Sequence, residues 1–196
     1  MKTNPPAWTE AILRLFLRPD LFLSVSGDLL EQYRDSILPI RGLARANAWY
    51  LKQVLGFAVR KIFPWAALFA CNFVGRFAWD MLSPTTDFHM RSQITTYTSI
   101  ALLVAVGFWT AWHSGSLLSG AAAGLVTVAT ASLLSMTGNV VLVAFWHNAA
   151  AMRAISASGG LDEAFLLPLI LIVPGSILGG IGGLVGAGAK FLARMS

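Results

Sequence analysis

The sequence is short of charge and of cysteine. Only 12% of the 196 residues are Asp, Glu, Lys or Arg, whereas water-soluble domains usually carry about 25%. This deficit excludes an ordinary soluble globular domain. Cys71 is the only cysteine, which excludes an intramolecular disulfide. No set of side chains has the spacing of a catalytic site or of a metal site, so we expect neither an enzymatic activity nor a cofactor.

The few charges are unevenly distributed along the chain. Fourteen of the 23 charged residues lie in the first 61 positions, and nine of those fourteen are Lys or Arg. This shift in composition divides the chain into a basic, water-facing head (residues 1–61) and an apolar body (residues 62–196). The net charge of +5 is explained by membrane topology and anionic lipid, so we expect no nucleic-acid partner.

The body contains four apolar stretches long enough to cross a bilayer, which needs about 20 helical residues. Helices are expected because they satisfy their own backbone groups within lipid. We therefore predict an all-α, polytopic membrane protein with four transmembrane helices and a small helical head. The expected spans are residues 62–82, 94–112, 118–143 and 165–192. Gly138-Asn139 are expected to kink or shorten the third span, and Pro168 and Pro174 to bend the fourth.

The orientation follows from the positive-inside rule. Lys and Arg flank the first and last spans on the side of the head, whereas the opposite side receives only Arg91 and Arg153. We expect a protein of the bacterial inner membrane with both termini in the cytoplasm. Aromatic residues near the span ends are expected to act as interfacial anchors. They are Trp49, Tyr50, Trp65, Trp109 and Trp112 on the cytoplasmic side, and Trp79 and Trp146 on the outer side.

The head is predicted to contain three short helices, over residues 7–17, 21–36 and 43–61. The third is amphipathic and basic, and helices of this kind next to a span commonly lie in the lipid headgroup layer. Alternatively, its apolar side packs on the first two helices as a small core. We expect a mixture of the two, because about 60 residues form a marginal independent domain.

Three segments of the head occur in an order found in a known family. They are Pro19-Asp20, the run from Gly27 to Arg34 (GDLLEQYR), and the run from Ala48 to Val54 (AWYLKQV). Over about residues 7–58 the chain resembles the permease prefix domain, which precedes FtsX-like permeases of the macrolide-exporter type. In that family a long permease follows, with a bulky domain after its first span. Here the loop after the first span has about ten residues, so the resemblance does not imply transport.

Two candidate sites involve ionisable side chains. Arg76 and Asp80 lie four residues apart in the first span; an intrahelical ion pair is the simpler interpretation, and a functional site is the alternative, because charges at such depth are costly. His89 and His147 are expected on the outer side and could ligate a metal. Nothing in their spacing is typical of a metal site, however, and interfacial polar residues are the simpler interpretation.

The last span is rich in glycine. Gly175, Gly179, Gly183 and Ala187 recur every four residues on one face, and small residues at this spacing allow helices to pack closely. A phosphate-binding loop is excluded because such loops follow a strand and lie in water.

We expect a non-enzymatic accessory or interaction protein, with the lipid bilayer and either a larger membrane protein or further copies of this chain as partners. The alternative is a small transporter or channel subunit that uses the Ser/Thr-rich middle spans.

Overall fold

The computed structural model describes residues 4–83, 87–145, 149, 152–153, 156, 160–193 and 195. Every regular element in these ranges is helical, which confirms the all-α prediction. Four of the described helices are long and apolar enough to cross a membrane. The chain therefore has the architecture of a multi-pass membrane protein.

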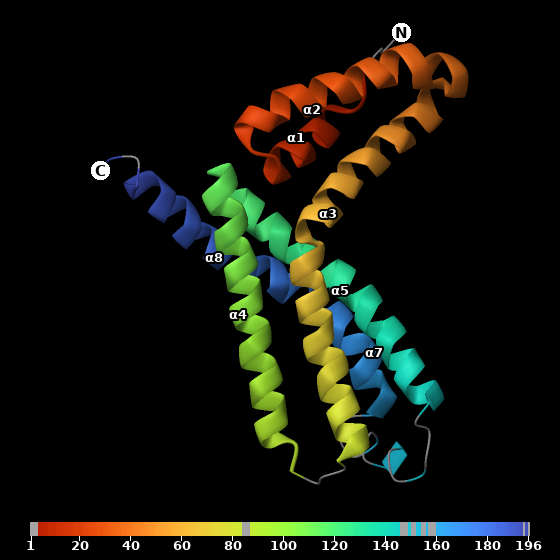
Figure 1. Ribbon diagram of the computed structural model, residues 1–196, viewed down its shortest axis with the longest axis vertical. Helices are drawn as coiled ribbons and strands as arrows, with labels where there is room; N and C mark the ends of the chain where they lie inside the picture. The colour runs from red at the N-terminus through yellow and green to blue at the C-terminus, as the bar shows by residue number, and fades with distance from the viewer. Residues whose placement is uncertain are drawn as a thin grey trace.

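The described elements follow one another as a helical head and a bundle (Figure 1). In Figure 1, α1, α2 and the first part of α3 lie together at one end, and the rest of α3 forms a bundle with α4, α5, α7 and α8. The N and C labels are both near the head end of the molecule. The elements are α1 (Ala7–Phe16), α2 (Pro19–Gln32), the π-helical turn η1 (Tyr33–Ile37), α3 (Leu38–Leu82), α4 (His89–Ser114), α5 (Leu117–Phe145), α7 (Gly160–Ile170) and α8 (Ile172–Leu192).

The head has its own apolar core. Pro19 ends α1 and begins α2, because proline disfavours a helical residue before it and is favoured at a first helical position; Arg18 is accordingly extended. The Tyr33 and Tyr50 rings meet edge to face at 5.9 Å, and the Tyr33 hydroxyl donates to Asn47 Oδ1 at 2.7 Å. The buried members of the head core are Leu13, Phe22, Leu29, Tyr33, Ala46, Tyr50 and Val54.

The third head helix and the first span are one helix, α3. The chain turns into it at Gly42, whose φ of 71° is favourable only for glycine. Figure 1 shows α3 changing direction between head and bundle, and Pro64, which cannot donate to the carbonyl one turn earlier, lies near this boundary. The buried face of residues 43–61 packs in the head core. Of the two expected placements, the structure therefore has the small core, and no separate helix precedes the span.

The fourth span is interrupted near its start, where a bend was expected from Pro168 and Pro174, whereas the third span is longer than expected. The predicted fourth span is divided into α7 and α8 at Leu171, because Pro174 has no N–H to donate to the carbonyl of Ile170. In contrast, α5 continues through Gly138 to Phe145, so the prediction that Gly138-Asn139 end the third span is wrong. A Cβ on Gly138 would meet Val74 of α3 at 2.8 Å. This glycine therefore permits a close helix contact and does not end the helix.

Two further cores hold the bundle together. One lies among the spans and consists of Ala66, Phe69, Ala70, Leu103, Val128 and Ala131. The other joins the head to the bundle and consists of Phe16, Ala58, Ile62, Val106 and Ala123. In addition, Lys61 Nζ donates to the carbonyl of Phe16 at 2.6 Å. The end of α1 is thus attached directly to the bundle.

Candidate functional site

A buried carboxylate, Asp80, lies near the end of α3 and is 3% exposed. Arg76, one turn earlier, has its Nε 3.7 Å from Oδ2 of Asp80. Arg91 of α4 comes closer, and its Nη1 donates to Oδ1 of Asp80 at 2.8 Å. The carboxylate therefore lies between two guanidinium groups that come from two helices.

Arg91 was counted from the sequence as a flanking charge on the side opposite the head, but it is buried within a helix. The residue belongs to the first turn of α4, is 8% exposed, and its guanidinium carbon lies 4.7 Å from the centre of the Trp79 ring. Its burial is possible because Asp80 neutralises it and Trp79 offers the negative face of its ring.

A second polar contact lies deeper between the same two helices. Asn72 Nδ2 donates to the carbonyl of Thr95 and to Oγ of Ser99, both at 3.0 Å. The members of the Asp80–Arg91 pair are 11 residues apart in the sequence, and those of the Asn72–Ser99 pair are 27 residues apart. Both pairs have the same midpoint in the sequence, between α3 and α4. In a tight antiparallel hairpin, residues equally distant from the loop face each other, so this symmetry is a signal that could have identified Arg91.

A small cavity adjoins these contacts. Its volume is about 120 Å³, which corresponds to about four water molecules at liquid density. Arg76, Thr95, Thr96 and Ser99 supply its polar wall, and residues of α3, α4, α7 and α8 supply an apolar one. Among the described residues no group of three or more His, Cys, Asp or Glu could hold a metal ion, so the cluster acts chemically as an interhelical ion pair and hydrogen-bond network.

The glycine face of α8 lies against two helices. A Cβ on Gly179 would stand 2.5 Å from the carbonyl oxygen of Gly120, and one on Gly183 would stand 2.9 Å from that of Leu117, both at α5. Gly175 is buried against Val128 and Gly124, and Ala187 is partly buried at the other end of the stripe.

The sequence analysis missed a second glycine face. A Cβ on Gly182 would overlap the carbonyl of Val104, and one on Gly186 would overlap that of Phe108, both on α4. Gly107 of α4 in turn lies against the backbone of Gly179. Gly182 and Gly186 are four residues apart and each directly precedes a member of the first stripe, Gly183 or Ala187. This second pair was the available signal for a helix that packs on two sides.

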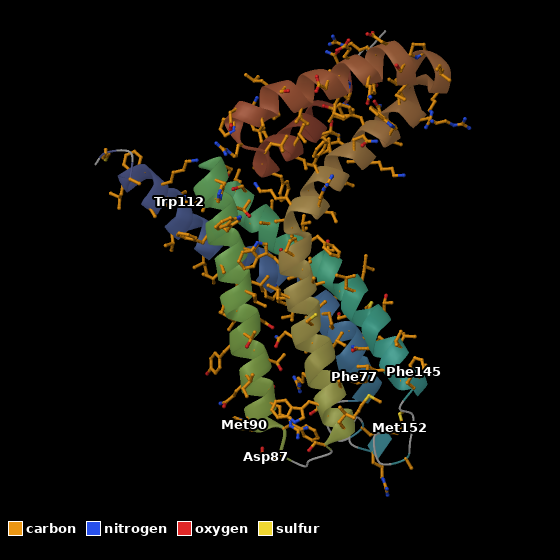
Figure 2. The ribbon with its side chains drawn as sticks, in the orientation of Figure 1. Phe77, Asp87, Met90, Trp112, Phe145 and Met152 are labelled. Atoms are coloured by element: carbon orange, nitrogen blue, oxygen red, sulfur yellow. The ribbon has the colours of Figure 1, made fainter. Side chains whose placement is uncertain are left out.

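The aromatic residues assigned as interfacial anchors occupy different environments. Tyr50 is completely buried in the head core, so it cannot contact lipid headgroups, and Trp49 packs beside that core. Trp65 is partly buried where the head meets the bundle. Trp79 and Trp109 are about half exposed, and Trp112 stacks on Phe108 near the head end of α4 (Figure 2). Trp146 lies outside the described residues.

Of the two histidines, only His89 belongs to the residues that the structure describes. His89 is exposed at the first position of α4, close in sequence to Asp87 and Met90, which Figure 2 labels at the loop end of the bundle. Its Nε2 lies 3.1 Å from Nε2 of Gln93, a contact within one helix. His147 lies outside the described residues.

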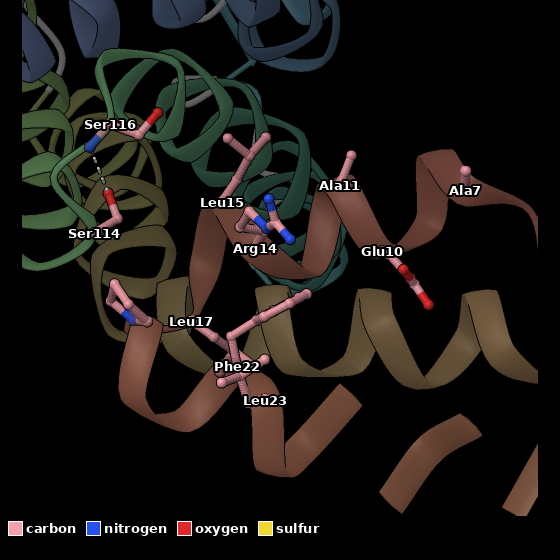
Figure 3. Close-up of a pocket in the computed structure, with 11 residues that line it drawn as sticks. Ala7, Glu10, Ala11, Arg14, Leu15, Leu17, Phe22, Leu23, Ser114 and Ser116 are labelled. Carbon is pink, nitrogen blue, oxygen red and sulfur yellow. Dashed lines mark hydrogen bonds between the residues drawn. The ribbon is translucent and has the colours of Figure 1, made fainter. Parts of the chain in front are cut away.

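A groove of about 720 Å³ lies between the head and the turn that joins α4 to α5 (Figure 3). Arg14 of α1 lies over the Phe22 ring of α2, 4.8 Å from its centre. Ser114 and Ser116 form the opposite edge, where the N–H of Ser116 donates to Oγ of Ser114 at 3.2 Å. The groove is lined by Ala7, Glu10, Ala11, Arg14, Leu15, Leu17, Pro19, Phe22, Leu23, Ser114 and Ser116.

Comparison of the chain with protein-family models, with curated proteins and with solved structures finds no match.

Proposed function

We propose that this chain is a non-enzymatic accessory protein of the bacterial inner membrane, which holds a small helical head at a fixed position for docking to a larger membrane protein. The observation that carries the proposal is the shared helix α3. It supplies Ala46, Tyr50 and Val54 to the head core and Ala66 and Phe69 to the bundle core. A head that only needed tethering could be joined by a flexible linker, whereas a shared helix fixes its position.

Contacts outside α3 support the same function. Phe16, at the end of α1, is buried together with Val106 of α4 and Ala123 of α5. Lys61 adds a hydrogen bond to the carbonyl of Phe16. Displacement of the head would therefore expose apolar surface, at a cost of about 25 cal/mol per Å².

The head also carries apolar side chains that no described residue covers. Leu21 and Ile40 are 49% and 82% exposed. Apolar surface on a water-facing domain favours a protein partner. The resemblance of residues 7–58 to the permease prefix domain suggests an exporter-type permease as the class of that partner.

The alternative is a small transporter or channel subunit, and the placement of the hydroxyl groups weighs against it. Ser132 Oγ lies 2.8 Å from the carbonyls of Val128 and Pro168. Ser135 donates to the carbonyl of Ser132, and Thr137 to that of Leu133. Hydroxyl groups bonded to helix carbonyls stabilise packing and are not available to a solute. Thr110 and Thr127 are described residues of the same spans whose buried hydroxyls have no such partner.

Purification of the full chain from native membranes in mild detergent tests the proposal. We expect a larger membrane protein to co-purify in a fixed ratio, and Ile40→Glu to reduce its recovery. Arg41→Glu, at the neighbouring exposed position of the head, is the control. Recovery of homo-oligomers alone, with ion flux after reconstitution in liposomes, would instead favour the transporter.

The orientation has its own test. We propose that both termini are cytoplasmic, because the flanks of the spans at the head end are the more basic ones. A reporter fused after Ser196 should be active as a cytoplasmic reporter, and one inserted after Ser83 as an external reporter. Export of the C-terminal reporter would contradict this orientation.

A further inference from the structure

The groove between α1, α2 and the α4–α5 turn lies at the boundary of the membrane-spanning bundle. Its edge residue Ser114 is the last residue of α4, and α5 begins at Leu117. Half-exposed Trp109 lies little more than one turn before that end, and tryptophan is enriched at the level of lipid headgroups. The end of a membrane-spanning helix and a nearby tryptophan are both features of the headgroup level of a bilayer, so this level is the one expected for the groove.

The wall of the groove combines apolar side chains with one accessible cation. Leu15, Leu17 and Leu23 provide the apolar part. The guanidinium of Arg14 stacks on Phe22, an arrangement that orients the group while its N–H donors remain at its edge. One carboxylate, Glu10 of α1, also lines the groove, one helical turn before Arg14. Among the described residues no carboxylate lies within ion-pair distance of Arg14, and Asp20, outside the groove lining, pairs with Arg18 at 3.3 Å.

The surroundings of the groove are basic. Lys61 is held beside Phe16, and its pKa lies below the ordinary value because the amine is buried and because the positive charge of Arg18 is near. On the opposite side, Lys190 Nζ donates to the carbonyl of His113 at 2.8 Å, next to the turn. Cations brought together in this way attract an anion, which would reduce their mutual repulsion.

We propose that this groove is a binding site for one anionic phospholipid. The phosphate of the lipid accepts hydrogen bonds from Arg14, and the part of one acyl chain next to the glycerol packs on Leu15, Leu17 and Leu23. A guanidinium group binds phosphate through two parallel hydrogen bonds. The apolar wall and the location at the end of the spans select a lipid over a soluble phosphate. This site is independent of the proposed docking function, because it needs no protein partner.

Native mass spectrometry of the full chain in detergent, titrated with phosphatidylglycerol or with phosphatidylcholine of the same acyl chains, tests the proposal. The wild type should retain one phosphatidylglycerol at a concentration about tenfold lower than phosphatidylcholine, as expected for one charge-assisted contact to phosphate. Arg14→Gln should abolish this preference. Arg41→Gln, which makes the same charge change at an exposed position of the head, should keep it, and Arg14→Lys should lose less than Arg14→Gln.

Three outcomes would overturn the proposal. They are equal retention of the two lipids by the wild type, an equal loss of preference in Arg14→Gln and Arg41→Gln, and displacement of phosphatidylglycerol by millimolar inorganic phosphate, which would indicate a site for a soluble anion. If Arg14→Gln does not fold, Leu23→Glu gives the same reading. It places a carboxylate on a 76% exposed wall residue of the groove and should also abolish the preference.

Discussion

A methyl group added at Gly179 should destabilise the bundle, although alanine is the better helix former. An ideal Cβ at this position lies 2.5 Å from the carbonyl oxygen of Gly120, 2.9 Å from Cα of Gly124 and 3.0 Å from its nitrogen. All three are backbone atoms of α5, which cannot move aside as a flexible side chain would. Favourable carbon contacts are about 3.5–4.0 Å, so α5 and α8 must separate by about 1 Å.

The magnitude follows from two opposing effects. Alanine in place of glycine favours a helix by about 1 kcal/mol. Overpacking of a well-packed core typically costs about 1–3 kcal/mol, and the contact with a rigid backbone places Gly179→Ala at the upper end of that range. The net expected loss in the free energy of unfolding is about 1–2 kcal/mol.

Gly188 provides the matched control on the same helix. A Cβ at Gly188 has no atom within 4 Å, so Gly188→Ala should be neutral or stabilise by up to about 1 kcal/mol. Thermal unfolding in detergent, followed by tryptophan fluorescence, measures both variants, and size-exclusion chromatography detects altered assembly. Equal melting temperatures for the two alanine variants would refute the reasoning.

Three further predictions concern other parts of the fold. Gly179→Leu and Gly183→Leu should disrupt the bundle or its assembly, whereas Ile181→Leu at a half-exposed position should leave its melting temperature unchanged; equal behaviour of the three would place the glycines against lipid. Arg91→Gln should lower the free energy of unfolding, measured with denaturant, by about 3–5 kcal/mol because it leaves Asp80 with a weaker partner in a buried site. The double variant Arg91→Gln/Asp80→Asn should recover part of this loss. An undiminished loss in the double variant would contradict the ion pair. Tyr50→Ala should destabilise the head by about 3–5 kcal/mol through the cavity that it creates. Phe57→Ala, at an exposed position of the same helix, should leave the stability nearly unchanged when unfolding is followed by circular dichroism. Similar losses in the two variants would show that Tyr50 does not organise the head core.

The sequence is sufficient to predict the helical class and the spans, because both depend on local composition. Residues 62–192 are so poor in charge that only a membrane-spanning helical body satisfies their backbone groups. The bend of the last span was also predictable. A proline has no N–H to donate to the carbonyl four residues earlier, and Pro174 removes the hydrogen bond to Ile170 in this way.

Features that depend on contacts between distant residues could not be read in this way. The burial of Arg91 requires the register of α3 against α4, which is set by the length of the intervening loop. The burial of Tyr50 requires α1 and α2 to cover residues that an amphipathic pattern alone would equally assign to lipid. Periodicity identifies an apolar face but does not identify what covers it.

The ion pair between α3 and α4 has a consequence for how the protein enters the membrane. A single charged residue at the centre of an inserting helix costs about 2.5–3.5 kcal/mol. If the two helices entered one after the other, Asp80 and Arg91 would each meet lipid before meeting the other. If they enter together as a hairpin, the 2.8 Å contact forms as the charges leave water. Asp80 and Arg91 lie at the ends of their helices, where this cost is lower than at the centre. Insertion of α3 and α4 as a hairpin therefore lets Arg91 leave water already paired with Asp80, whereas Asp80 also has Arg76 on its own helix.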